Sequence, residues 1–164
     1  MPCSSSPTGV TNLLIDPFLT GNPTAAVAAD AVAPTAILVT HGHVDHLGDY
    51  VDISKRTGAR RPDFVIRLNG KTVHVAGDTA LFGDRDLIGD ENLDVAIIPI
   101  GGQYTMDATD ASRPSPSCVR RFVIAGHYNT FPTIGSDPVA FAEAVAASTK
   151  ARAVVLEPGQ SAEV

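Results

Sequence analysis

A histidine-rich loop directly after an apolar stretch is the feature that most constrains the fold of this chain. The apolar stretch Ala36–Thr40 is expected to form a buried strand, and it runs straight into His41-Gly-His43-Val-Asp45-His46. A strand that ends in such a loop turns alternate imidazoles toward one point. Only five histidines occur in the 164 residues, so a polar turn that holds three of them by chance is disfavoured. Three imidazoles and a carboxylate are donors that a divalent ion such as zinc prefers.

Short apolar runs and helical patterns alternate along the rest of the chain. Strands are expected at 12–16, 63–68, 72–76, 93–100, 121–125 and 153–156, with a hairpin at Asn69-Gly70. Helices are expected at 45–57, ending at Gly58, and after Asp137-Pro138, with one or two helical turns within 24–32. Two prolines make 112–117 a poor helix or strand. This alternation predicts an α/β layered fold.

Composition limits the classes of function. The net charge of -6 disfavours a nucleic-acid partner, because such proteins concentrate Lys and Arg. Cys3 and Cys118 form neither a disulfide framework nor a cysteine-based zinc site. The first basic residue is Lys55, and no apolar run has the length of a membrane span, so we expect a cytoplasmic protein without a membrane partner. Residues 1–11 are expected to be disordered and 12–164 to form one domain.

Two further residues are candidates to complete a metal site with the loop. Asp78 follows a strand and Gly77, where its carboxylate can reach outward and bridge two ions. His127 also follows a strand and a glycine; alone it would be interpreted as a capped surface histidine, but together with the loop it is interpreted as a ligand. His74, inside a strand, is interpreted as a packed or edge residue. Asp16 is either the acceptor that holds an imidazole tautomer or a simple Asp-Pro turn former.

Paired metals suit hydrolysis, because they generate hydroxide near neutral pH and polarise the substrate. No Gly-x-Ser-x-Gly elbow and no P-loop occurs in the sequence. Asp45 and Asp78 are therefore the expected catalytic residues of a metal-dependent hydrolase that acts on a small-molecule substrate.

The loop resembles the His-x-His-x-Asp-His signature of the metallo-β-lactamase superfamily. The chain is most similar to the bacterial and archaeal metal-dependent hydrolases that resemble ascorbate-phosphate lactonases. The matching blocks are 14–23, 37–48, 77–83, 99–101, 127–132 and 155–159.

The resemblance implies an αββα sandwich with one or two divalent ions, zinc by default or else manganese or iron, at one edge of its two sheets. It places His41 and His43 on one metal and Asp45, His46 and His127 on the other. Asp78 would bridge the two ions, and Asp16 would support the loop from beneath. A metal-bound hydroxide would attack an ester-like, lactone or phosphoester bond.

Three departures from the family predict an incomplete sandwich. The N-terminal strands are replaced by a Ser/Pro-rich start, and a middle segment is missing at Arg60-Arg61-Pro62, including the histidine that completes the first metal's ligands. A helix expected after Met106 is replaced by Ser112–Arg121. Exposed edges and apolar faces then favour pairing into a homo-oligomer.

Two alternatives to an active hydrolase follow. The first is a non-catalytic, truncated relative with a partial metal site. The second is a nuclease of the same superfamily, which the acidic charge and the few aromatic residues disfavour.

Overall fold

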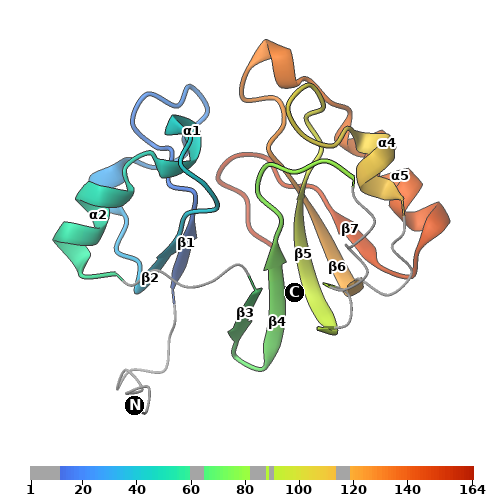
Figure 1. Cartoon of the computed structure of the whole chain (residues 1–164), viewed down its shortest axis with the longest axis horizontal. Helices are drawn as coiled ribbons and strands as arrows, with labels where there is room; N and C mark the ends of the chain where they lie inside the picture. Colours follow the sequence, from blue (N-terminus) through green and yellow to red (C-terminus); the bar gives the residue numbers. More distant parts are fainter. Residues whose placement is uncertain (1–11, 60–64, 82–87, 89–90, 114–118) are drawn as a thin grey trace.

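The computed structural model describes residues 12–59, 65–81, 88, 91–113 and 119–164. These residues form two β-sheets side by side, each covered by helices on its outer face, so the layers run helix, sheet, sheet, helix (Figure 1). The incomplete αββα sandwich expected from the sequence is confirmed. The expectations for residues 1–11, the joint at 60–62, Cys3 and Cys118 lie outside the described residues.

The first layer is small. Its sheet pairs β1 (Leu13–Ile15) in parallel with β2 (Ala36–Leu38), and the short helix η1 (Ala29–Ala31) lies between them in the chain. The loop after β2 leads into α1 (Val44–Leu47) and then α2 (Tyr50–Thr57). Ile53 of α2 packs with Ile37 and Val39, and these three buried residues form the core of this layer.

The second layer is a five-stranded sheet in the order β3-β4-β5-β6-β7, in which only the β3–β4 pair is antiparallel. Asn69 and Gly70 have φ values of 50° and 76°, which the tight hairpin turn requires, so the predicted hairpin is confirmed. The strand bounds are β3 (Val65–Leu68), β4 (Lys71–Val75), β5 (Leu93–Pro99), β6 (Val119–Gly126) and β7 (Arg152–Val154).

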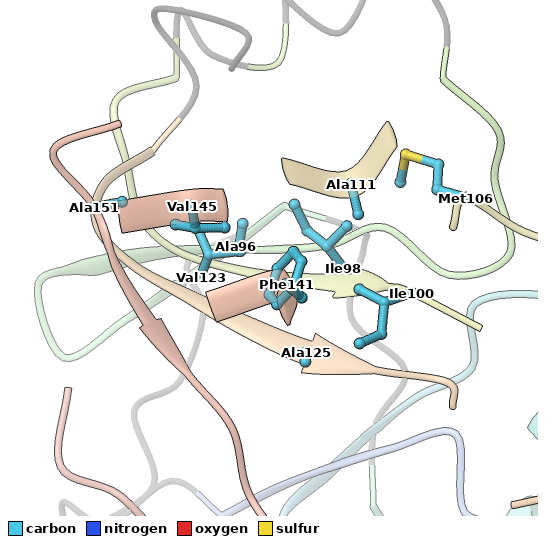
Figure 2. Packing of buried hydrophobic residues seen from close by; sticks show 10 residues of the cluster. All are labelled: Ala96, Ile98, Ile100, Met106, Ala111, Val123, Ala125, Phe141, Val145 and Ala151. Carbon is cyan, nitrogen blue, oxygen red and sulfur yellow. The ribbon is translucent and has the colours of Figure 1, made fainter. Parts of the chain in front are cut away.

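Two helices cover the outer face of this sheet, and the main core lies between these helices and the sheet (Figure 2). They are α4 (Ala108–Ser112) and α5 (Pro138–Ser148), with the short η2 (Pro132–Ile134) before α5. Asp137 begins α5, because its carboxylate accepts hydrogen bonds from the amides of Val139 and Ala140. Ten buried residues make up the cluster: Ala96, Ile98, Ile100, Met106, Ala111, Val123, Ala125, Phe141, Val145 and Ala151.

The continuous helix expected at 45–57 is wrong, because the chain breaks between α1 and α2 at Gly48. Gly48 has a φ of 41°, and a Cβ there would lie 2.3 Å from the carbonyl oxygen of Pro17. The amide of Asp49 donates to that same oxygen at 2.8 Å. The break therefore allows the histidine loop to lie against the segment that follows β1.

Other boundaries differ by a few residues. Within 24–32 only the single turn of η1 forms, and β6 begins two residues before the expected strand. Ser112 ends a short helix, and residues 114–118 of the proline-rich stretch lie outside the described part. No helix within the described ranges is long and apolar enough to span a membrane.

Candidate metal centre

The candidate centre lies at the carboxyl ends of three strands that belong to both sheets. The histidine loop follows β2, Asp78 follows β4, and His127 follows directly on the last residue of β6. Parallel strands present their carboxyl ends at one edge of a sheet, which is where ligands bind in open α/β sheets. The six residues predicted as metal ligands are brought together there.

These six residues fall into two clusters of three. His41, His43 and Asp78 form the first cluster, and Asp45, His46 and His127 form the second. Within each cluster, one donor atom from every residue lies within 4.8 Å of the others. In the first cluster Nε2 of His41 and Nδ1 of His43 are 2.9 Å apart. The family resemblance separated the histidines and Asp45 in the same way, but it placed Asp78 as a bridge between the two sets.

Asp78 belongs to the first cluster but also faces the second. Its Oδ2 is 3.5 Å from Nε2 of His41, in the first cluster. Its Oδ1 is 3.2 Å from Nε2 of His46 and 3.3 Å from Nε2 of His127, both in the second cluster. One carboxylate thus faces both clusters with separate oxygens, which is the geometry of a bridging group.

A carboxylate beneath the loop orients one of the histidines. Oδ2 of Asp16 is 2.8 Å from Nδ1 of His46, and Oδ1 of Asp16 accepts a hydrogen bond from the Thr40 amide at 2.7 Å. Because a carboxylate only accepts, the proton of that imidazole lies on Nδ1. The lone pair on Nε2 of His46 is therefore directed toward Asp78 and the second cluster. Of the two interpretations of Asp16, the geometry matches the tautomer-holding acceptor.

Thr40 extends this network to the first cluster. Its hydroxyl donates to Oδ2 of Asp16 at 2.8 Å, so its oxygen is left as an acceptor 3.1 Å from Nδ1 of His41. An acceptor at that place puts the proton of His41 on Nδ1 and its lone pair on Nε2, on the side of Asp78. The loop at Asp78 packs closely on Thr40, because a Cβ at Gly77 would lie 2.8 Å from its Cβ. Sequence reasoning missed Thr40, although a hydroxyl residue directly before the first histidine of the loop was a usable signal.

The local electrostatics favour a positive charge at the second cluster. Burial lowers the pKa of His46, but the hydrogen bond to Asp16 and the charges of Asp16, Asp78 and Asp45 outweigh burial and raise its pKa. Burial and the neighbouring His46 lower the pKa of His41, against the opposing effect of Asp78. The donors thus attract positive charge where the carboxylates gather.

Two buried atoms show that a cation fits between the clusters. Nε2 of His46 and Oδ1 of Asp78 are 3.2 Å apart but lack the alignment of a hydrogen bond, and neither finds such a partner elsewhere among the described residues. In the neutral imidazole of His46, whose proton lies on Nδ1, both atoms present lone pairs to the same space. Buried acceptors that face each other without a proton are costly, and a bound cation removes that cost.

The chain also takes unusual backbone conformations beside the centre. Asp16 and His127 both have positive φ values, 43° and 52°, which residues other than glycine rarely adopt. A Cβ at Gly101 would lie 2.4 Å from the carbonyl oxygen of His127, so this stretch is packed tightly from behind. Strain of this kind concentrates at functional sites. His74, in contrast, pairs with Val65 and Ala96 within the sheet and belongs to neither cluster, as predicted.

A pocket of about 210 Å³ opens beside the second cluster, and sequence reasoning missed it. Its polar wall contains Asp16, Asp45, His46 and His127. Its apolar wall comes from distant segments, including Phe18 after β1 and Phe131 after β6, and no local pattern connects those two residues.

The chain matches a family model and curated relatives. Residues 8–62 match the model of the metallo-beta-lactamase superfamily. A UPF0173 metal-dependent hydrolase from Pelotomaculum thermopropionicum is 36% identical, over 95% of this chain and 94% of the relative. A second one, from Desulforamulus reducens, is 37% identical over 91% of this chain and 90% of that relative. The first alignment spans 214 positions against a chain of 164 residues, so the relative contains segments that this chain lacks.

Solved structures agree with these matches. Igni18, a metallo hydrolase from Ignicoccus hospitalis, superimposes with a TM-score of 0.81 at 28% identity, covering 92% of this chain and 89% of that one. A metal-dependent hydrolase from Parabacteroides distasonis shares the fold at a TM-score of 0.61 and 15% identity, covering 86% of this chain and 83% of that one. This chain therefore belongs to the UPF0173 metal-dependent hydrolases of the metallo-beta-lactamase superfamily.

Proposed function

We propose that this chain hydrolyses an ester-like, lactone or phosphoester bond of a small molecule with metal held by His41, His43, Asp45, His46, Asp78 and His127. The observation that carries the proposal is that Asp78 faces both donor clusters with separate oxygens. Nitrogen and carboxylate donors suit zinc best, and manganese and iron also accept such a set.

A divalent metal, when bound there, supplies a Lewis acid and acidifies a water near neutral pH. The protein's own contribution is to fix the donors. Asp16 and Thr40 hold protons on Nδ1 of His46 and His41, so that both Nε2 lone pairs are directed toward the centre. In this proposal Asp78 would accept a hydrogen bond from the attacking water, and the partly exposed carboxylate of Asp45 would take up a proton from it.

The same geometry supports a second candidate, a non-catalytic relative with a partial metal site. The first cluster has only three donors within the described residues, and His43 is exposed. A four-coordinate ion would lack one protein ligand there, whereas the second cluster with Asp78 offers four.

Elemental analysis of the purified chain separates the two candidates, with His127→Ala as the comparison. About two ions per chain, falling in the variant, together with hydrolysis of p-nitrophenyl butyrate, a lactone or bis(p-nitrophenyl) phosphate, would support the hydrolase. About one ion without turnover would support the partial site. A folded chain that takes up no metal would contradict both.

A further inference from the structure

The pocket beside the second cluster has two distinct walls. Asp45, His46 and His127 form the wall that belongs to the centre. Most of the remaining lining residues are apolar, and they include Ile15, Phe18, Ile97, Phe131 and Ile134. The rings of Phe18 and Phe131 lie 6.4 Å apart between centroids, so these two loops meet at the pocket. A molecule with its reacting bond at the centre therefore has an apolar surface within reach.

The described pocket wall contains no Lys or Arg side chain. Among the described arginines, Arg67 and Arg121 pair with Glu91 and Asp94, away from the pocket. Arg56 donates to backbone carbonyl groups of the first layer. Phosphate groups are commonly held by Arg or Lys, and the described lining offers an anionic substrate neither of them.

From these walls we propose that the pocket binds the acyl group of an uncharged carboxylic ester or lactone. The inference rests on the proposed hydrolase function and narrows its substrate class. Water adds to the carbonyl carbon, the bond from that carbon to the alcohol oxygen breaks, and the products are a carboxylic acid and an alcohol. The apolar wall contacts the acyl chain and leaves the carbonyl carbon at the centre.

The size of the pocket limits the acyl chain. Its volume of about 210 Å³ is below the range of roughly 300–1,000 Å³ that is usual for drug-sized ligands. A pocket of this size accommodates a short acyl chain, and longer chains extend into solvent.

A series of p-nitrophenyl esters tests the proposal on the metal-loaded chain. We expect kcat/KM to rise about tenfold from the acetate to the butyrate, because each buried CH2 group contributes about 0.8 kcal/mol. It should rise no further beyond the hexanoate. Turnover by the His127→Ala variant is subtracted as background. A series that is flat or falls from the acetate would overturn the proposal.

Phe131→Ala removes part of the apolar wall without removing a metal donor. We expect this variant to lose most of the gain in kcat/KM from acetate to butyrate while its metal content stays the same, and we expect Phe131→Leu to restore that gain. Tyr104→Ala is the matched control, because Tyr104 is an exposed aromatic residue outside the pocket wall. An unchanged chain-length profile in Phe131→Ala would contradict the assignment of this wall.

An anionic probe separates failure of this inference from failure of the proposed function. Bis(p-nitrophenyl) phosphate releases the same p-nitrophenol leaving group as the esters, but the molecule itself carries a negative charge. If it is hydrolysed faster than the butyrate, the chain is a hydrolase but the substrate class is wrong. If neither probe is hydrolysed by the metal-loaded chain, the hydrolase function itself fails.

Discussion

Replacing Asp16 with asparagine tests whether the tautomer of His46 controls metal binding. Asp16 accepts from the Thr40 amide through Oδ1 and from Nδ1 of His46 through Oδ2, at 2.7 Å and 2.8 Å. In the D16N variant, the oxygen of the new side-chain amide must stay opposite the Thr40 N–H group. Its NH2 group then faces Nδ1 of His46 and donates to it, which moves the imidazole proton to Nε2.

The magnitude follows from one hydrogen bond. To bind metal through Nε2 of His46, the D16N variant must break the new hydrogen bond at Nδ1. It also lacks the charge-assisted hydrogen bond between Nδ1 and the Asp16 carboxylate, and a bond of that kind contributes about 1.5–3 kcal/mol. Since about 1.4 kcal/mol is tenfold in affinity, we expect metal affinity to fall roughly ten- to hundredfold. The side chain keeps its size and still accepts from the Thr40 amide, although the Thr40 hydroxyl loses its acceptor at Oδ2, so the metal-free fold should be retained.

The assay is competition for Zn²⁺ against a chromophoric chelator, with metal-free unfolding in urea measured in parallel. Asp49→Asn is the control, because the Asp49 carboxylate also accepts two hydrogen bonds, from the amides of Leu19 and Thr20, but belongs to neither donor cluster. The reasoning is refuted if D16N binds zinc within twofold of the unchanged chain, or if Asp49→Asn loses as much affinity per folded molecule.

Three further predictions concern the surroundings of the centre. Thr40→Val should lower zinc affinity about tenfold in the same competition assay, because Nδ1 of His41 loses its acceptor, whereas Thr40→Ser should retain it. Gly48→Ala should destabilise the chain by about 3 kcal/mol in urea unfolding, because its Cβ would lie 2.3 Å from the Pro17 oxygen at a positive φ; an unchanged midpoint would contradict the contact. Burial raises the pKa of Asp49, but hydrogen bonds from Thr20 and Leu19 outweigh burial and lower its pKa. The stabilisation that the ionised Asp49 carboxylate gives the folded chain is therefore fully present above about pH 3.9, its pKa in the unfolded chain, and it is lost as the pH falls through the lowered pKa of the folded chain. Asp49→Asn should therefore make the free energy of unfolding less dependent on acid pH.

The candidate centre could be predicted from the sequence because its residues are marked locally. Four donors lie within 41–46, directly after an apolar strand, and the other two each follow a strand and a glycine. Parallel strands that end at a common edge bring such residues together without any further information. The hairpin at Asn69-Gly70 was predictable for a similar reason, since its turn requires positive φ at both positions.

Features that depend on distant contacts were missed. The helix break at Gly48 exists because Pro17 lies against it, and the periodicity of residues 45–57 contains no trace of that contact. The apolar pocket joins Phe18 to Phe131, which are brought together only by the packing of the two layers. Thr40 is intermediate, because its position was visible but its three polar contacts required the fold.

The six donors are distributed unequally between the two layers. Four belong to the loop that follows β2 in the first layer, and Asp78 and His127 belong to the second. Each cluster therefore contains at least one donor from either side of the sandwich, so an ion that binds either cluster also fastens the small layer to the large one. A bound metal would then act as a removable cross-link between two sheets that share no strand. A chelator would act on the architecture of the protein as well as on its chemistry.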